Sequence, residues 1–248
     1  MSLHLNIRRF SLLSTAALGA FASAGQAVMI EELLVTSTPL QFEDGLPPEK
    51  IPANVQSLDT VDVDDSQALG LADMLNTALG SVHLNAAQGN PLQPDLQYRG
   101  AAASPLLGLP QGLSVYQNGV RINEPLGDAV NWDLLPETAI HRIQLRGGSD
   151  PVFGLNTLGG ALSVEMKNGF NFQGHAAEAT AGSFGRRIGS IESGANDGRF
   201  GYYVNGYYFE EEGWRDLSDS DLYSFYGALN WRGARGDLEL SHQFGDSF

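Results

Sequence analysis

The feature that most restricts the fold of this chain is a series of alternating segments that begins at Gly174. Runs of about ten residues are separated by turns, and about ten residues is the length that a tilted strand needs to cross a bilayer. In one run the alternate positions form an apolar face with aromatic residues at both ends, made of Tyr223, Phe225, Gly227, Leu229 and Trp231, opposite Ser224, Ala228 and Asn230. The pattern predicts antiparallel transmembrane strands over 175–184, 187–195, 199–209, 221–231 and 237–244. A soluble β-sandwich also alternates in this way and is the alternative.

The connections between these runs differ in length. Short turns at 196–198 and 232–236 alternate with a longer connection over 210–221. Barrels of the outer membrane have short periplasmic turns and longer outer loops. The spacing therefore also predicts an orientation, with the longer connection on the outer side.

The N-terminus has the pattern of a secretory signal peptide over residues 1–27. Arg8 and Arg9 form a positive region, an apolar run follows, and small residues allow cleavage after Ala24 or after Ala27. The apolar run is shorter than the roughly 20 residues of a spanning helix, which favours a cleaved signal over an anchor. Secretion of a chain without Cys suits the envelope of a Gram-negative bacterium, although a secreted enzyme without Cys is also compatible.

Composition disfavours several classes of function. The chain has 14 Lys and Arg against 29 Asp and Glu, a formal charge of −15, and no Cys. Such a chain is a poor candidate for binding nucleic acid, and it has no thiol for catalysis or for a Cys-based zinc site. The His residues are scattered without ligand spacing, and no Walker, Gly-x-Ser-x-Gly or His-Glu-x-x-His motif occurs. We therefore expect neither an enzyme, nor a metal site, nor a cofactor.

The region before the alternating runs has a mixed pattern. Gln67 to Ala78 carries apolar residues at helical spacing, with a cap at Asp65 or Ser66 and a stop at Gly80. Asn118-Gly119 joins two β-prone runs and is a strong hairpin signal. Short strands are predicted over 81–86, 96–99, 113–117, 120–122, 140–146 and 161–167. One helix among short strands predicts a compact α+β unit.

A β-prone leader, Glu31 to Pro39, precedes this unit and is followed by a loop-like stretch with Pro47-Pro48. Such a segment can add itself as a strand to the sheet of a partner, where backbone hydrogen bonds provide the affinity. It can equally be the first strand of the next domain. Composition alone leaves both interpretations open.

Five motifs follow one another through the chain after the leader. They are Ala72-Asp73-Met74-Leu75 with Gly80-Ser81-Val82, then Leu96 to Gly100, Val115 to Pro125, Ala139 to Gly147, and Phe153-Gly154 with Leu158 to Leu162. In this order and at these spacings, they resemble the plug domain of a TonB-dependent outer-membrane receptor. The resemblance covers roughly residues 28–168.

The resemblance implies four parts: a signal peptide (1–27), a TonB box with a linker (28–52), a plug domain (53–168) and the first strands of a barrel (169–248). The implied fold class is an α+β plug domain followed by antiparallel transmembrane β-barrel strands, about the first five of an expected 22. The leader then resembles a TonB box, whose residues are expected to bind TonB: Glu31, Glu32, Leu33, Leu34, Val35, Thr36, Ser37 and Thr38.

The chain departs from the family pattern in two respects. His141 and Gln144 stand where the family usually has an acid, and Gly148 stands where it usually has a proline, so ion pairing between plug and barrel through these sites is not expected. In addition, 22 strands of about ten residues need at least about 220 residues. The residues after Asn168 are too few for that, so the chain is expected to be a fragment or the product of a truncated gene.

The resemblance implies active uptake of a scarce nutrient across the outer membrane, most often a ferric siderophore. Cobalamin, other metal chelates and oligosaccharides are alternatives, and a truncated, non-transporting, plug-like periplasmic binding protein is another. The implied partners are TonB with ExbB and ExbD, the lipid of the outer membrane and the nutrient itself.

The resemblance also indicates where the nutrient binds, because family receptors use plug loops at the outer apex. The matching positions are Arg99, Asn123, Glu124, Asp128 and Trp132. Polar groups beside an aromatic ring suit a pocket that orients a ligand. For Arg99, a structural hydrogen bond at the strand end is the alternative. The acidity of the set argues against strongly anionic ligands.

Overall fold

The computed structural model describes residues 52–60, 71–85 and 90–247. The predicted signal peptide, the predicted TonB box and the first part of the predicted helix lie outside these ranges. No helix in the described ranges is long and apolar enough to cross a membrane.

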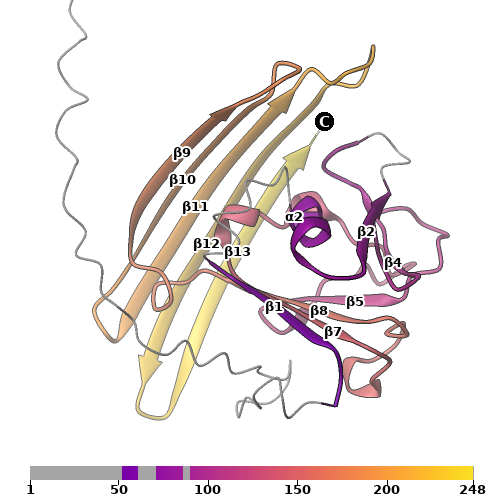
Figure 1. The fold of residues 1–248 in the computed structure, drawn as a ribbon. Coiled ribbons are helices and arrows are strands. Elements are labelled where there is room, and N and C mark those ends of the chain that lie inside the picture. The colour runs from indigo at the N-terminus through magenta and orange to yellow at the C-terminus, as the bar shows by residue number, and fades with distance from the viewer. Residues whose placement is uncertain (1–51, 61–70, 86–89, 248) are drawn as a thin grey trace, which may run out of the picture. The chain divides into compact units, whose positions relative to one another are not determined.

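A five-stranded sheet, called the core sheet below, organises the N-terminal half, in the order β1-β7-β8-β5-β6. Its strands are β1 (Val55–Asp59), β5 (Leu113–Gln117), β6 (Val120–Arg121), β7 (Ile140–Gly147) and β8 (Gly160–Met166). β5 and β8 are parallel and the other neighbours are antiparallel. Figure 1 shows β1 beside β7 at the edge of this sheet.

A smaller sheet and the helix α2 (Leu71–Ala78) are the other main elements among the described residues of this half. β2 (Val82–Asn85), β3 (Asp95–Tyr98) and β4 (Ala101–Ala103) form an antiparallel sheet in chain order. The helix α2 buries one side, formed by Leu71, Ala72, Met74 and Leu75. These side chains join Tyr98 and the apolar face of the core sheet in one hydrophobic core. The predicted combination of a helix near residues 71–78 with short strands is confirmed for the described residues.

Three short 3₁₀ helices connect the strands of the core sheet. They are η2 (Trp132–Leu134), η3 (Glu137–Ala139) and η4 (Pro151–Phe153). Gly148 and Gly159 are joined by a backbone hydrogen bond of 2.9 Å between β7 and β8. Gly160 begins β8 with φ 145°, and a Cβ atom there would overlap the carbonyl oxygen of Arg146. The two Gly-Gly pairs therefore act as breaks between strands, as expected.

A second five-stranded sheet, called the C-terminal sheet below, contains β9 to β13 in chain order, with all neighbours antiparallel (Figure 1). Its strands are β9 (Gly174–Ala181), β10 (Arg187–Asn196), β11 (Phe200–Glu211), β12 (Ser220–Gly233) and β13 (Gly236–Ser247). All five predicted strands are confirmed, with ends that differ by at most three residues.

The two faces of the C-terminal sheet differ in burial. On β12, the side chains of Tyr223, Phe225 and Leu229 are exposed, whereas Tyr226 and Asn230 are buried. The predicted apolar face is thus the exposed one, which in a membrane contacts lipid. The opposite face is less polar than predicted, because Leu222 and several Tyr side chains lie on it and pack against the N-terminal half.

A buried ion pair joins Lys167, the first residue after β8, to the C-terminal sheet. The Nζ atom of Lys167 lies 3.1 and 3.3 Å from the two carboxylate oxygens of Glu192, and the side chains are 2% and 13% exposed. The hydroxyl of Tyr203 donates to the same carboxylate at 2.6 Å, and Nζ lies 5.0 Å from the Phe172 ring centre. This chain therefore has its own ion pair between the two sheets.

The positions where the chain departs from the family pattern lie elsewhere. His141 contacts the hydroxyl group of Thr60. This hydroxyl lies 3.0 Å from the Nδ1 of His141 and donates to the backbone carbonyl of His141 at 2.8 Å. Gln144 pairs with Ser57 across the edge of the core sheet. Both positions thus contact β1 or the residue that follows it.

Candidate functional site

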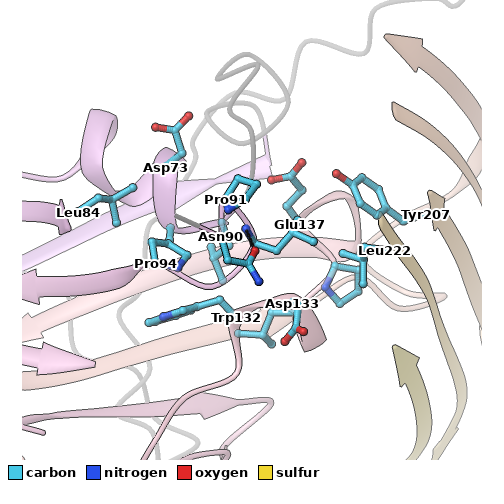
Figure 2. Close-up of a pocket in the computed structure, with 15 residues that line it drawn as sticks. Asp73, Leu84, Asn90, Pro91, Pro94, Trp132, Asp133, Glu137, Tyr207 and Leu222 are labelled. Carbon is cyan, nitrogen blue, oxygen red and sulfur yellow. Dashed lines mark hydrogen bonds between the residues drawn. The ribbon is translucent and has the colours of Figure 1, made fainter. Parts of the chain in front are cut away.

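A cavity of about 180 Å³ lies where the N-terminal half meets the C-terminal sheet (Figure 2). It is bounded by α2, the loop 90–94, the segment that contains η2 and η3, and the buried face of β11 and β12. Its lining includes Leu71, Ala72, Asp73, Leu84, Asn90, Pro91, Leu92, Pro94, Trp132, Asp133, Leu135, Pro136, Glu137, Tyr207 and Leu222. A mainly apolar concavity with a few polar groups is the usual form of a small-ligand site.

The charged groups in the lining all have the same sign. Asp73, Asp133 and Glu137 are acidic, and no Lys or Arg is among the described residues that line the cavity. In Figure 2 the hydroxyl end of Tyr207 faces the carboxyl group of Glu137. Within the described ranges, no three His, Asp or Glu side chains are grouped so that they could hold a metal ion. The cavity therefore suits an apolar group that is neutral or positively charged.

Glu137 is the carboxyl group in this cavity whose pKa departs clearly from its ordinary value. Burial, reinforced by the negative charges of Asp73 and Glu178, raises the pKa of Glu137 to about 8. Burial disfavours the charged form of a carboxyl group, and nearby negative charges act in the same direction. At neutral pH the group is therefore mostly protonated and can donate a hydrogen bond into the cavity.

Replacing Glu137 with Gln should change how stability depends on pH. A carboxyl group with a raised pKa in the folded state contributes stability that is complete below its unfolded pKa and is lost as pH rises towards 8. The Glu137→Gln variant lacks this loss. Between pH 5 and pH 9, its free energy of unfolding should therefore increase by about 1–3 kcal/mol relative to that of the parent protein. Chemical unfolding across this range measures the effect, and parallel curves for the two proteins would contradict it.

Trp132 is the predicted ligand residue that the structure places in the cavity. It begins η2, its side chain is 3% exposed, and its indole Nε1 has no hydrogen-bond partner among the described residues. A buried donor without a partner is costly and is often completed by a ligand or water. Trp132 thus combines an apolar ring with a free donor in the cavity wall.

Asn123, Glu124 and Asp128 lie together in a different place, the loop that follows β6. The Glu124 N–H donates to the Ala129 carbonyl at 2.8 Å, and the Glu124 carboxylate accepts from the Asn131 amide at 3.1 Å. Asp128 forms an ion pair with Arg121 at 2.9 Å. The structure therefore brings these three predicted residues together, outside the lining of the cavity.

Asn123 is an internal brace of this loop. Its side chain, 8% exposed, accepts from the N–H of Val115 at 2.7 Å. Its amide donates to the carbonyls of Leu113 and Asp128, each at 3.1 Å. These three partners are backbone groups, and the Nε of Arg121 also donates to the Asn123 side-chain oxygen at 3.3 Å. The amide of Asn123 therefore holds the loop against β5.

The Asn123→Ala variant should lose about 2–4 kcal/mol of stability, because it leaves buried backbone groups of β5 without partners. A Glu124→Ala variant, which removes an exposed carboxylate from the same loop, should lose less than about 0.5 kcal/mol. Denaturant unfolding of the two variants measures the difference. Equal losses would show that Asn123 does not brace the loop.

Arg99 lies neither in the lining of the cavity nor in the loop that contains Asn123, Glu124 and Asp128. Its backbone has φ 49°, in the left-handed region, its N–H donates to the Ser81 carbonyl at 3.4 Å, and its guanidinium lies 5.1 Å from the Tyr98 ring centre. The side chain is exposed. The hydrogen bond is made by the backbone of Arg99, and a role of its exposed guanidinium in ligand binding stays a prediction.

Several cavity residues have no signal in the sequence. Asp73 reads as a polar position on an amphipathic helix, and Tyr207 and Leu222 read as ordinary positions of transmembrane strands. Only tertiary structure brings them beside Trp132. Glu137 has a weak signal, since an acid between Pro136 and the buried strand β7 has few ways to reach bulk water.

Comparison with known proteins identifies the N-terminal half. A family model described as "TonB-dependent Receptor Plug Domain" matches residues 47–161. The vitamin B12 transporter BtuB of Vibrio cholerae serotype O1 is 27% identical over 150 residues, which is 60% of this chain and 23% of the relative. The chain thus spans about a quarter of the length of the curated relatives it matches.

Solved structures share the fold of both halves. The ferric preacinetobactin receptor BauA from Acinetobacter baumannii covers 85% of this chain with a TM-score of 0.66 and 18% identity, and this chain covers 30% of BauA. The ferric yersiniabactin receptor FyuA from Yersinia pestis covers 79% with a TM-score of 0.60 and 13% identity, with 32% of FyuA covered. The predicted fold class, a plug domain followed by antiparallel strands of a barrel, is confirmed.

Proposed function

Because its plug domain and the sheet that follows place this chain among the TonB-dependent receptors, we propose that it takes part in active uptake of a nutrient across the outer membrane. The family consists of transporters and receptors of Gram-negative outer membranes, not of enzymes. Residues 53–168 act as the plug, and residues 169–248 contribute strands to the surrounding barrel. The signal peptide over 1–27 directs the chain through the inner membrane.

The energy for uptake comes through the segment Glu31 to Thr38, which acts as the TonB box. TonB, driven by ExbB and ExbD, binds this segment by strand addition and pulls on it. The segment precedes β1, which is an edge strand of the core sheet. The proposal is supported by this placement, because a pull on the leader reaches first the strand with a single neighbour.

The nutrient is a ferric siderophore without strong negative charge, and cobalamin is the second candidate. The observation that carries this choice is the cavity, whose lining contains the acids Asp73 and Asp133 beside the mostly protonated Glu137 and has no Lys or Arg among its described residues. A chelate with several negative charges is repelled by carboxylates in a partly desolvated site, whereas a neutral or cationic one is not. The relatives include a vitamin B12 transporter and a receptor for ferric preacinetobactin. Glu124, Asp128 and Arg99 are proposed to contact the parts of the ligand outside the cavity, and Asn123 is proposed to hold the loop that presents Glu124 and Asp128.

Uptake of iron from defined chelates tests this proposal. In cells that express the natural-length receptor, iron should enter from an uncharged ferric hydroxamate at least about tenfold faster than from a ferric tricatecholate, a difference of about 1.4 kcal/mol. The uptake should stop in cells without TonB. Combining Asp73→Asn with Asp133→Asn, which removes two acids from the lining, should reduce the difference in uptake rate between the two chelates. A preference for the tricatecholate would rule out the cavity as the selective site, and uptake of cyanocobalamin alone would favour the second candidate.

A further inference from the structure

One side chain connects the edge of the core sheet to the end of α2. Gln56 lies on β1, and its Oε1 accepts a hydrogen bond from the Gly80 N–H at 2.6 Å. Its Nε2 donates to the Gly80 carbonyl at 3.2 Å and to the Asn54 side chain at 3.1 Å. Both backbone polar groups of Gly80 are therefore hydrogen-bonded to the side chain of a residue in the core sheet.

Gly80 occupies the junction between α2 and β2. The last backbone bond of the helix runs from the Leu79 N–H to the Leu75 carbonyl, and Ser81 then has φ 65° before β2 begins. The C-terminal end of a helix needs partners for groups that the helix itself does not satisfy. Gln56 bonds the backbone groups of Gly80, just beyond this end of the helix, at the point where the chain reverses into β2.

β1 is one of the two edge strands of the core sheet and is the one that follows the leader. It lies at the edge of the sheet and pairs with β7 through five residue pairs. A strand with one neighbour can leave without breaking the pairing of the others, and local opening of this kind needs less free energy than global unfolding. Its N-terminal end continues into the leader that we propose as the TonB box.

The elements on the other side of Gly80 form part of the cavity wall. α2 contributes Leu71, Ala72 and Asp73, and β2 contributes Leu84. A change in the position of α2 and β2 therefore changes the cavity. Through Gln56 and Gly80, the cavity wall is in hydrogen-bond contact with β1.

We propose that Gln56 is a positioning residue that couples the release of β1 to the opening of the cavity wall. When β1 leaves, Gly80 loses both of its side-chain hydrogen bonds, and α2 and β2 are held less firmly. Coupling between two events is reciprocal, so a ligand that fills the cavity also holds β1 in the sheet. This consequence rests on the proposed function: a pull by TonB on the leader would weaken the binding of the nutrient in the cavity.

The absence of Cys from the chain allows a direct test. Ser57 and Gln144 are register partners on β1 and β7. A Ser57→Cys, Gln144→Cys pair can form a disulfide that locks β1 in place, and reduction unlocks it. Hydrogen exchange of the natural-length receptor in detergent then reports on the opening of residues 71–85 with β1 locked or free.

With Gln56 present, oxidation of the pair should slow exchange over residues 71–85 about fivefold, the order expected for one or two accessible hydrogen bonds. In the Gln56→Leu background the lock should leave this exchange unchanged. Gln56→Glu keeps the acceptor for the Gly80 N–H and loses the donor. In this variant, oxidation of the pair should slow the exchange of residues 71–85 by less than in the parent. Gln97→Leu, the same substitution at an exposed position of β3, should respond as the parent does.

Two results would overturn the coupling: a lock that slows residues 71–85 equally with and without Gln56, or a lock that has no effect in the parent. Because the measurement uses neither TonB nor a nutrient, its outcome is separate from that of the uptake test. A receptor that fails to import any chelate but shows the predicted exchange would retain the coupling and lose the proposed function.

Discussion

Replacing Lys167 with Met should lower the free energy of unfolding by about 3–5 kcal/mol, because it leaves the carboxylate of Glu192 buried without its cation. Both carboxylate oxygens lie within 3.3 Å of Nζ, and the pair is almost entirely removed from water. Tyr203 still donates to the carboxylate, but a neutral hydroxyl replaces little of the lost attraction. Calorimetric unfolding of the purified receptor measures the change.

Two controls distinguish charge burial from loss of packing. Adding Glu192→Gln to Lys167→Met removes the uncompensated charge and keeps an acceptor for Tyr203, so it should restore about half of the loss. Arg187 and Glu210 form a pair at 3.4 Å on neighbouring strands of the same sheet, with side chains 71% and 41% exposed. Arg187→Met should therefore cost less than about 1 kcal/mol. A double variant as unstable as the single one would show that the methylene chain of Lys167, and not its charge, is what stabilises the contact.

The strands of the C-terminal sheet could be predicted because apolar and polar residues alternate over the whole length of each strand. A strand with lipid on one face and protein on the other repeats every two residues over its whole length, as Tyr223, Phe225 and Leu229 do on β12. Short strands inside a domain lack such a signal. β1 (Val55–Asp59) was not predicted because Leu58 is its one fully buried residue, and β4 (Ala101–Ala103) was not predicted because Ala is a poor strand former.

The candidate site was less predictable than the fold. Family resemblance indicated loops that the structure places in two locations: Trp132 in the cavity, and Asn123 with Asp128 in the braced loop. A polar residue in a loop has the same appearance in sequence whether it faces a ligand or holds backbone. Only the hydrogen bonds of Asn123 distinguish the two, and only tertiary packing brings Tyr207 to the cavity.

Replacing Leu34 with Pro should abolish TonB-dependent uptake, with a decrease of at least about a hundredfold. Proline has no N–H to donate and interrupts a strand that pairs through its backbone. The residue lies in the middle of the proposed TonB box, outside the described residues, and far from the cavity in sequence. Binding of the nutrient to cells without energy should therefore be unchanged while transport is lost.

The matched control is Leu40→Pro, the same substitution immediately beyond Pro39, where the β-prone run has ended. It should transport at the parental rate, because no strand pairing is proposed there. Uptake and equilibrium binding of one radiolabelled chelate, measured on the same cells, separate energy coupling from recognition. Normal transport by Leu34→Pro would remove Glu31 to Thr38 as the TonB box, whereas equal loss in both variants would point to a general need for an extended leader. Loss in Leu34→Pro alone would place the coupling on backbone pairing within this segment.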